Sequence, residues 1–162
     1  MPEIMGYPFV PKSTAHLRPG HFWAVPLDGN RFACGQVLQV KASEISSKTR
    51  MFFGGLCNWI GRERPTADVI RGRGFVGFGV MHIKAVLMSG GEILGDSPLD
   101  QDVSIPLLLS HQYGNDVLLL RGAERIRLAD KTERESLPVK GVWGYDFIRV
   151  LAEAQLAKQS MP

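Results

Sequence analysis

Apolar and polar residues alternate with a period of two in several parts of the chain, most clearly between residues 20 and 38. Two apolar runs there flank Asp28-Gly29-Asn30, and both the Asp-Gly and the Gly-Asn step accept the positive φ angles of a tight turn. The pattern therefore predicts a β-hairpin with a two-residue loop. Alternation then places on one core face Trp23, Val25 and Leu27 of the first strand with Phe32, Cys34 and Leu38 of the second.

Apolar segments further along the chain predict more short strands, roughly six or seven in all. Met51–Ile60 contains a glycine pair that fits a helix interior poorly, so a bulged strand is expected there. Residues 75–88 are rich in β-branched and aromatic side chains, and the turn residues 89–91 predict a second hairpin with residues 92–95. Residues 116–121 predict another strand, preceded by a turn at Tyr113-Gly114-Asn115.

Helical spacing appears only towards the C-terminus. Thr132 and Glu135 have the spacing of a capping box, and Pro138 limits the short helix that they would begin. Residues 142–158 predict an amphipathic helix that packs across one face or opening of the sheet. The apolar residues that recur at helical spacing in it are Trp143, Phe147, Leu151 and Ala154, with Ile148 adjoining.

Length and composition set the domain organisation. A chain of 162 residues, 44% hydrophobic and 22% charged, can bury a core without disulfides or metal, so a single domain over residues 19–162 is expected. Residues 1–18 predict an extended arm anchored by Phe9 and Val10. With 18 glycines and 10 prolines favouring tight turns, the expected fold is α+β. It is a mainly antiparallel, strongly bent sheet or small SH3-like barrel with a C-terminal helix packed on it.

The cellular location and the state of the cysteines follow from the same patterns. The apolar runs fall far short of the roughly 20 residues that span a bilayer, and the first 19 residues lack the layout of a secretory signal. A cytoplasmic protein without membrane contact is expected. Cys34 and Cys57 have no neighbouring metal ligand, which favours two buried reduced thiols over a disulfide or a metal site.

Three groups of residues have the composition of catalytic or ligand sites but not their spacing. The glycine-rich residues 72–79 lack the context of a nucleotide-binding loop and instead predict a twisted strand against which another element packs. Ser110-His111, with Asp102 and Asp116 nearby, has the residue types of a hydrolase triad but no nucleophile elbow. The histidines show no metal-ligand spacing. We therefore expect no catalytic residues, no metal and no cofactor.

Charge patterning points to protein recognition. The net charge of +3 is too small to imply nucleic acid by itself, but arginines crowd residues 62–73 and aspartates gather at residues 96–102. Trp59 beside this basic segment has the residue mix of an interface hot spot, although a core position suits it equally well. The predicted contact residues are Trp59, Arg62, Arg64, Arg71, Arg73 and Phe75, with Asp96, Asp100 and Asp102 as a second patch.

Three segments resemble, in order, landmarks of the bacterial polymorphic-toxin immunity proteins of the "immunity protein 26" type. Residues 20–38 match the first: a glycine, an aromatic strand ending in Pro-Leu, an Asp-Gly turn and Gly-Gln-Val-Leu. Residues 91–99 are similar to the second, which usually carries a Trp where this chain has Glu92. Gly141-Val142-Trp143 resembles the third, which opens a helix. The resemblance implies a non-enzymatic protein that binds and neutralises a cognate toxin stoichiometrically.

One alternative comes from a different class of protein. A small β-barrel module could bind RNA or DNA through the Arg/Gly/Phe segment 62–78, with Phe75 and Phe78 as stacking platforms. That function predicts an affinity that falls steeply with salt. The sequence leaves three points open: the identity and activity of the toxin, whether inhibition is by occlusion or by allostery, and whether the protein forms a homodimer.

Overall fold

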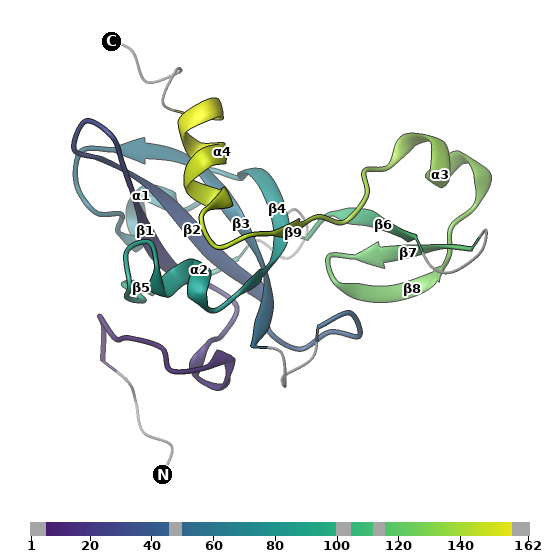
Figure 1. The fold of residues 1–162 in the computed structure, drawn as a ribbon, viewed down its shortest axis with the longest axis horizontal. Helices are drawn as coiled ribbons and strands as arrows, with labels where there is room; N and C mark the ends of the chain where they lie inside the picture. The colour runs from purple at the N-terminus through teal and green to yellow at the C-terminus, as the bar shows by residue number, and fades with distance from the viewer. Residues whose placement is uncertain (1–5, 46–49, 100–104, 112–115, 157–162) are drawn as a thin grey trace.

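The structure, a computed structural model, describes residues 6–45, 50–99, 105–111 and 116–156, and these form an α+β fold with mainly antiparallel strands (Figure 1). The larger sheet has six strands in the order β5-β1-β2-β3-β4-β9, and only the β4–β9 pair is parallel. Its strands do not close into a barrel, because β5 and β9 are the edges. They are β1 (His21–Leu27), β2 (Arg31–Gln39), β3 (Met51–Gly61), β4 (Phe75–His82), β5 (Gly95–Asp96) and β9 (Val142–Trp143).

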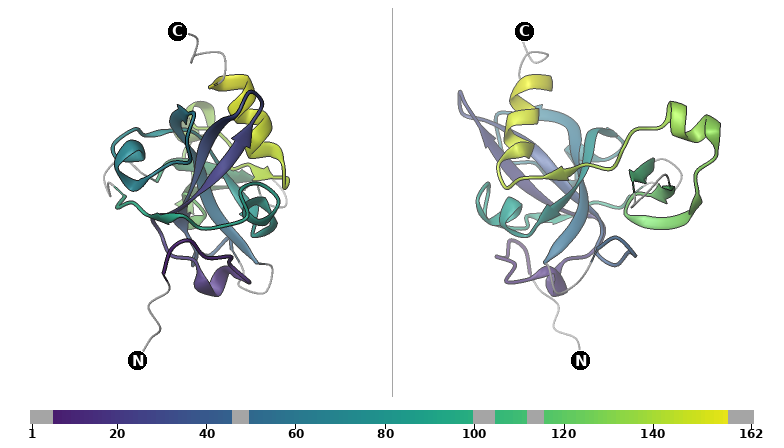
Figure 2. Two further views of the ribbon diagram at one scale, coloured as in Figure 1. Left: turned by 90° about the vertical axis from the view of Figure 1, so that its left-hand side faces the viewer. Right: turned by 45° about the vertical axis from the view of Figure 1, so that its right-hand side comes forward.

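A smaller antiparallel sheet lies beside the first and contains three strands in the order β6-β7-β8. Figure 1 and the right-hand view of Figure 2 show it as a separate lobe, from which the chain returns through α3 (Lys131–Ser136) to β9 in the larger sheet. Its strands are β6 (Leu107–His111), β7 (Val117–Arg121) and β8 (Glu124–Leu128). The helices are η1 (Thr14–His16, a 3-10 turn), α1 (Ala67–Ile70), α2 (Lys84–Leu87), α3 (Lys131–Ser136) and α4 (Phe147–Gln155).

The two faces of the larger sheet are both buried, but against different elements. Trp23 of β1 and Phe52 of β3 lie on the first face, where Ile148 and Ala152 of α4 pack against them in one apolar cluster. The second face holds Phe53 and Val80 in a cluster shared with the smaller sheet, together with a separate cluster beneath α1. This double burial agrees with the mixed, partly apolar character of both sides of the first hairpin.

The first hairpin is confirmed, but the predicted core face of its second strand is wrong. Leu27 pairs with Arg31, so the loop contains three residues, 28 to 30, instead of two. Gly29 and Asn30 there have φ values of 77° and 57°. Because the side-chain period of a strand is two, one extra loop residue moves every side chain of β2 to the opposite face. Trp23 and its neighbours therefore share their face with Ala33, Gly35 and Val37.

The bulged strand predicted over Met51–Ile60 is confirmed as β3, which has extra residues against β2 between Leu56, the partner of Gly35, and Ile60, the partner of Ala33. The strand predicted over residues 75–88 is right only as far as His82, where β4 ends. A single helical turn, α2, follows, with the neighbouring residues Ala85 and Val86 both buried. Its backbone hydrogen bonds are helical, since the N–H groups of Leu87 and Met88 donate to the carbonyls of Ile83 and Lys84 at 3.2 and 2.8 Å.

The second predicted hairpin is also wrong. Gly95 and Asp96 form β5, which pairs with β1 and does not pair with β4. The strand predicted over residues 116–121 is confirmed as β7, Val117–Arg121. The turn predicted at Tyr113-Gly114-Asn115 lies outside the described residues.

The C-terminal helix is shorter than predicted. It begins at Phe147, and Val142 and Trp143 form β9 beside β4. Its buried residues are Ile148, Ala152 and Leu156, whereas Phe147 is 41% exposed. The predicted residues 157 and 158 lie outside the described part of the chain. Trp143 covers Gly79 of β4, so the glycine-rich strand does receive another element, as predicted.

The capping box of α3 uses a different pair from the predicted Thr132 and Glu135. The backbone N–H of Glu133 donates to Asp130 Oδ1 at 2.8 Å, and the backbone N–H of Asp130 donates to Glu133 Oε1 at 2.9 Å. The helix therefore begins two residues earlier than the Thr132 box would allow, at Lys131. Its last residue is Ser136, close to Pro138 as expected.

Phe9 and Leu17 of the N-terminal segment are both buried in the main core cluster. The backbone of Phe9 pairs with that of Ile93 through two hydrogen bonds of 3.1 and 2.8 Å, and the Phe9 ring is buried beside His21. Val10 is 58% exposed, so its predicted anchoring role is wrong.

Candidate partner-binding cleft

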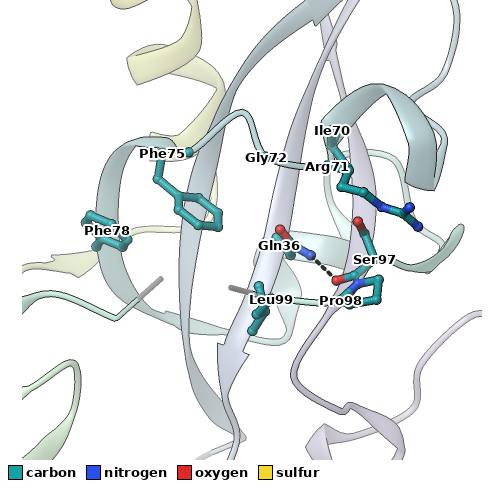
Figure 3. Close-up of a pocket in the computed structure, with 10 residues that line it drawn as sticks. Gln36, Ile70, Arg71, Gly72, Phe75, Phe78, Ser97, Pro98 and Leu99 are labelled. Atoms are coloured by element: carbon teal, nitrogen blue, oxygen red, sulfur yellow. Dashed lines mark hydrogen bonds between the residues drawn. The ribbon is translucent and has the colours of Figure 1, made fainter. Parts of the chain in front are cut away.

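A cleft of about 370 Å³ opens on the second face of the larger sheet, between the residues that follow α1 and those that follow β5. Figure 3 shows Phe75 and Phe78 on one side, Arg71, Ser97 and Pro98 on the other, and Gln36 and Leu99 between them. The cleft thus has one apolar side and one polar side. Its lining residues are Gln36, Ile70, Arg71, Gly72, Gly74, Phe75, Phe78, Ser97, Pro98 and Leu99.

Gln36 forms the polar floor of the cleft and is held rigidly. Its Nε2 donates to the carbonyl oxygens of Gly20 at 3.0 Å and Ser97 at 2.8 Å, and its Oε1 accepts a long contact of 3.8 Å from Cys57 Sγ. Only 4% of Gln36 is exposed. A buried amide with these partners costs little to bury. Because it ties the Ser97 wall to β2, Gln36 positions one side of the cleft.

The apolar side is built from two rings at the start of β4. The Phe75 and Phe78 ring centroids lie 5.4 Å apart, and Phe78 stacks on Phe53 of β3 with an interplanar angle of 2° and a centroid distance of 6.1 Å. Both lining rings are half-buried. Their exposed parts present an apolar surface that is preorganised by contacts within the sheet.

Arg71 stands at the opposite rim, on a tight turn. The backbone N–H of Arg73 donates to the Ile70 carbonyl at 3.2 Å, and Gly72 has a φ of +72°. With Arg71 at φ −59° and ψ 127°, this is a type II turn, which requires a residue such as glycine at its third position. Arg71 is exposed, whereas Arg73 Nε donates to the Val69 carbonyl at 3.2 Å. The turn therefore sets Arg71 at the cleft and fastens Arg73 to α1.

The structure places the predicted contact residues in three surroundings. Arg71 and Phe75 line the cleft, and half-buried Trp59 packs on the cluster beneath α1 that also includes Phe75. Arg62 is exposed on the loop after β3, and Arg64 lies 3.8 Å from Glu92 in an exposed ion pair that contributes little to stability.

The predicted acidic patch can be followed at one position only. Asp96 is exposed on the edge strand β5, next to Ser97 of the cleft wall. Asp100 and Asp102 lie outside the described residues.

Sequence reasoning missed the part of Gln36, Ser97 and Leu99 in this site. Gln36 is a polar residue within an apolar strand. Its polar character indicates a site only once the strand register shows which face of the sheet it occupies. Ser97 and Leu99 approach the cleft because β5 pairs with β1, a long-range contact that the predicted hairpin excluded.

The structure does not bring the candidate triad residues Ser110 and His111 into a hydrogen-bonded pair among the described residues. Ser110 Oγ donates to Glu44 Oε1 at 3.3 Å, and His111 is exposed. Asp102 is outside the described residues. In the described part of the chain, no group of three or more His, Cys, Asp or Glu side chains could hold a metal ion.

Both cysteines are free and buried behind the cleft floor, as predicted. Burial, followed by the interaction with Cys57, raises the pKa of the Cys34 thiol well above its ordinary value. Since the thiolate is the reactive form, Cys34 should react slowly with Ellman's reagent at pH 8 in the folded protein because of its raised pKa and its burial, and Cys57 because of its burial. We expect both to react at once in guanidinium. Fast reaction of either thiol in native buffer would contradict this burial.

Among the described residues, no helix combines the length and apolar character needed to cross a membrane. Comparisons of this chain with models of protein families, with curated proteins and with solved structures found no match.

Proposed function

We propose that this protein is a bacterial immunity protein that binds a cognate toxin and neutralises it stoichiometrically, in the cytoplasm. The observation that supports this proposal best is the joint position of Arg71 and Phe75, both expected at a partner interface, in one preorganised cleft. Trp59 packs in the neighbouring cluster. Trp and Arg supply much of the binding energy at protein interfaces, and Phe is enriched in their buried centres.

The α+β fold with mainly antiparallel strands agrees with the expected fold class. We propose that the six-stranded sheet is a bent, open version of the expected SH3-like barrel, with α4 as its packed C-terminal helix. Arg62, Arg64 and Arg73 lie on the same connecting segment as Arg71, between β3 and β4. A run of positive charge beside the cleft would speed association with an acidic toxin surface and disfavour non-cognate toxins.

Binding of RNA or DNA receives less support from the same residues. Base stacking requires a free ring face, and Phe78 already uses one face to stack on Phe53 while Phe75 tilts against Phe78, so less ring surface is open to bases. A protein partner needs only the exposed ring edges. An affinity that falls steeply with added salt, together with co-purifying nucleic acid, would favour the nucleic-acid function instead.

Growth protection tests the proposal. The toxin domain encoded next to this chain's gene should arrest growth when expressed alone, and co-expression of this chain should restore growth. We expect the double variant Arg62→Glu, Arg64→Glu to bind that domain about tenfold more weakly or worse, because both substitutions reverse charge at the proposed interface.

The matched control is Arg134→Glu, which reverses an exposed charge on α3 of the smaller lobe and should protect as well as the unmodified chain. Undiminished affinity of the double variant would remove Arg62 and Arg64 from the interface. Absence of protection by the unmodified chain would refute the proposed function.

A further inference from the structure

We propose that the cleft receives one extended segment of the protein partner, in which an apolar, preferably aromatic, side chain lies within two residues of an Asp or Glu. The apolar side chain would pack against Phe75, Phe78 and Leu99, and the carboxylate would pair with Arg71. This inference rests on the proposed function and specifies the chemistry of the partner that the cleft selects.

The charge of the lining residues supports the carboxylate. Among the 10 lining residues, Arg71 is the one charged side chain. An exposed guanidinium beside a half-enclosed apolar surface pairs strongly with a carboxylate, since two parallel N–H donors match its two oxygens. Arg62, Arg64 and Arg73 of the same segment do not line the cleft, so Arg71 is the arginine placed to meet a carboxylate inside it.

The opposite side of the cleft supports the apolar side chain. Phe75, Phe78 and Leu99 are each half-buried, so a partner side chain seated there would remove their remaining apolar surface from water. Figure 3 places Phe75 and Phe78 on the side opposite the Arg71 side chain, with Gln36 and Leu99 between them. One ligand group cannot serve both sides, so the occupant must carry two.

The size and rigidity of the cleft favour a short segment of a protein. Its volume of about 370 Å³ is near the lower end of the range for small-molecule pockets, and it suits one or two side chains. The Ser97 and Pro98 wall is tied to β2 through the 2.8 Å bond from Gln36, and the Arg71 rim is set by the type II turn. A preformed cleft of this kind loses little conformational entropy when a segment enters it.

Selection from a displayed library of random 12-residue peptides tests this inference on the full chain. We expect the enriched peptides to carry Asp or Glu within two residues of an aromatic or large aliphatic residue. Arg71→Gln should weaken their binding about tenfold, the effect of one charge-assisted pair. The matched control, Arg134→Gln, removes an exposed arginine on α3 of the smaller lobe and should leave the affinity within about twofold.

A double-mutant cycle separates the pair from other effects. Changing the peptide's acidic residue to its amide should weaken binding to the unmodified chain about tenfold but should have little further effect on Arg71→Gln. Leu99→Ser should weaken the binding of peptides that carry the apolar residue. Circular dichroism verifies that this variant is folded. The inference is overturned if no peptide is enriched, if enriched peptides bind Arg71→Gln undiminished, or if 3-phenylpropionate binds more tightly than they do.

The outcomes for the cleft and for the proposed function can be told apart. If the Arg71→Gln variant no longer binds the peptides but still neutralises the toxin fully, the toxin does not use the cleft. Only this inference then fails. If peptides bind as expected but the chain gives no growth protection, the immunity function fails and the recognition chemistry of the cleft remains.

Discussion

Replacing Gly35 by alanine is expected to lower the free energy of unfolding by about 3 kcal/mol, near the upper end for overpacking one methyl group into a core. A Cβ atom on Gly35 would overlap three atoms of the Trp23 indole ring. The ring has no room to move, since Trp23 is 0% exposed and meets Phe52 edge-on at a centroid distance of 5.7 Å. Denaturant unfolding followed by tryptophan fluorescence measures the loss.

Gly144→Ala is the matched control for this prediction, because nothing lies within 4 Å of the Cβ that it would add. It should change stability by no more than about half a kcal/mol. Combining Gly35→Ala with Trp23→Phe tests the mechanism, since the smaller ring makes room for the methyl group. The two changes together should cost about 1 kcal/mol less than the sum of their separate costs. Additive costs would contradict a direct clash.

The first hairpin shows both the reach and the limit of sequence reasoning. Alternation and the Asp28-Gly29-Asn30 turn located both strands, because these signals are local. The core face of β2 was wrong because it depends on whether the loop holds two residues or three. That choice is decided by the whole sheet, in which Gly35 must face Trp23, and not by turn propensity alone.

Short apolar runs were the other source of error. Residues 84–88 have strand-like composition, yet they form a helical turn in which the backbone N–H of Met88 donates to the Lys84 carbonyl at 2.8 Å. Val142 and Trp143 continue a helical spacing, yet they pair with β4, where Gly79 leaves space for the indole ring. In both cases tertiary packing overrides a pattern only a few residues long.

The candidate site could be predicted in part. Arg71 and Phe75 were found from local chemistry, since an arginine-rich turn beside an aromatic strand is a signal within a few residues. Gln36 and Ser97 could not be found in this way, because they are far apart in the sequence. They come into contact because β2 and β5 both pair with β1. The cleft exists because these distant segments are brought together.

Replacing Glu44 by glutamine is expected to cost about 2 kcal/mol at pH 7 and to loosen the contact between the two sheets. Arg125 Nε donates to Glu44 Oε2 at 2.9 Å, and Lys140 Nζ lies 3.5 Å from Glu44 Oε1. The Glu44 side chain is 9% exposed and that of Lys140 16%, so the pair is only weakly screened by solvent. Arg125 is half exposed, which keeps the expected cost below that of a fully buried ion pair.

The pH dependence of this cost has a definite sign. Burial alone raises the pKa of Glu44, but the hydrogen bond from Arg125 and the charges of Lys140 and Arg125 outweigh it and hold the pKa below its ordinary value of 4.5. A carboxyl group whose pKa is lowered by folding stabilises the fold above its unfolded-state pKa. That contribution is lost as the pH falls through the folded-state pKa.

The stability difference between the unmodified chain and Glu44→Gln should therefore be full at pH 7 and shrink steadily below about pH 4.5 as the carboxylate is protonated. Urea unfolding at several pH values measures it, and amide hydrogen exchange in β7 and β8 should quicken in the variant. Glu135→Gln, an exposed change in the smaller lobe, is the matched control and should show neither effect. A difference that stays constant from pH 7 to pH 3 would mean that Glu44 acts by packing, and that its charge does not hold the two sheets together.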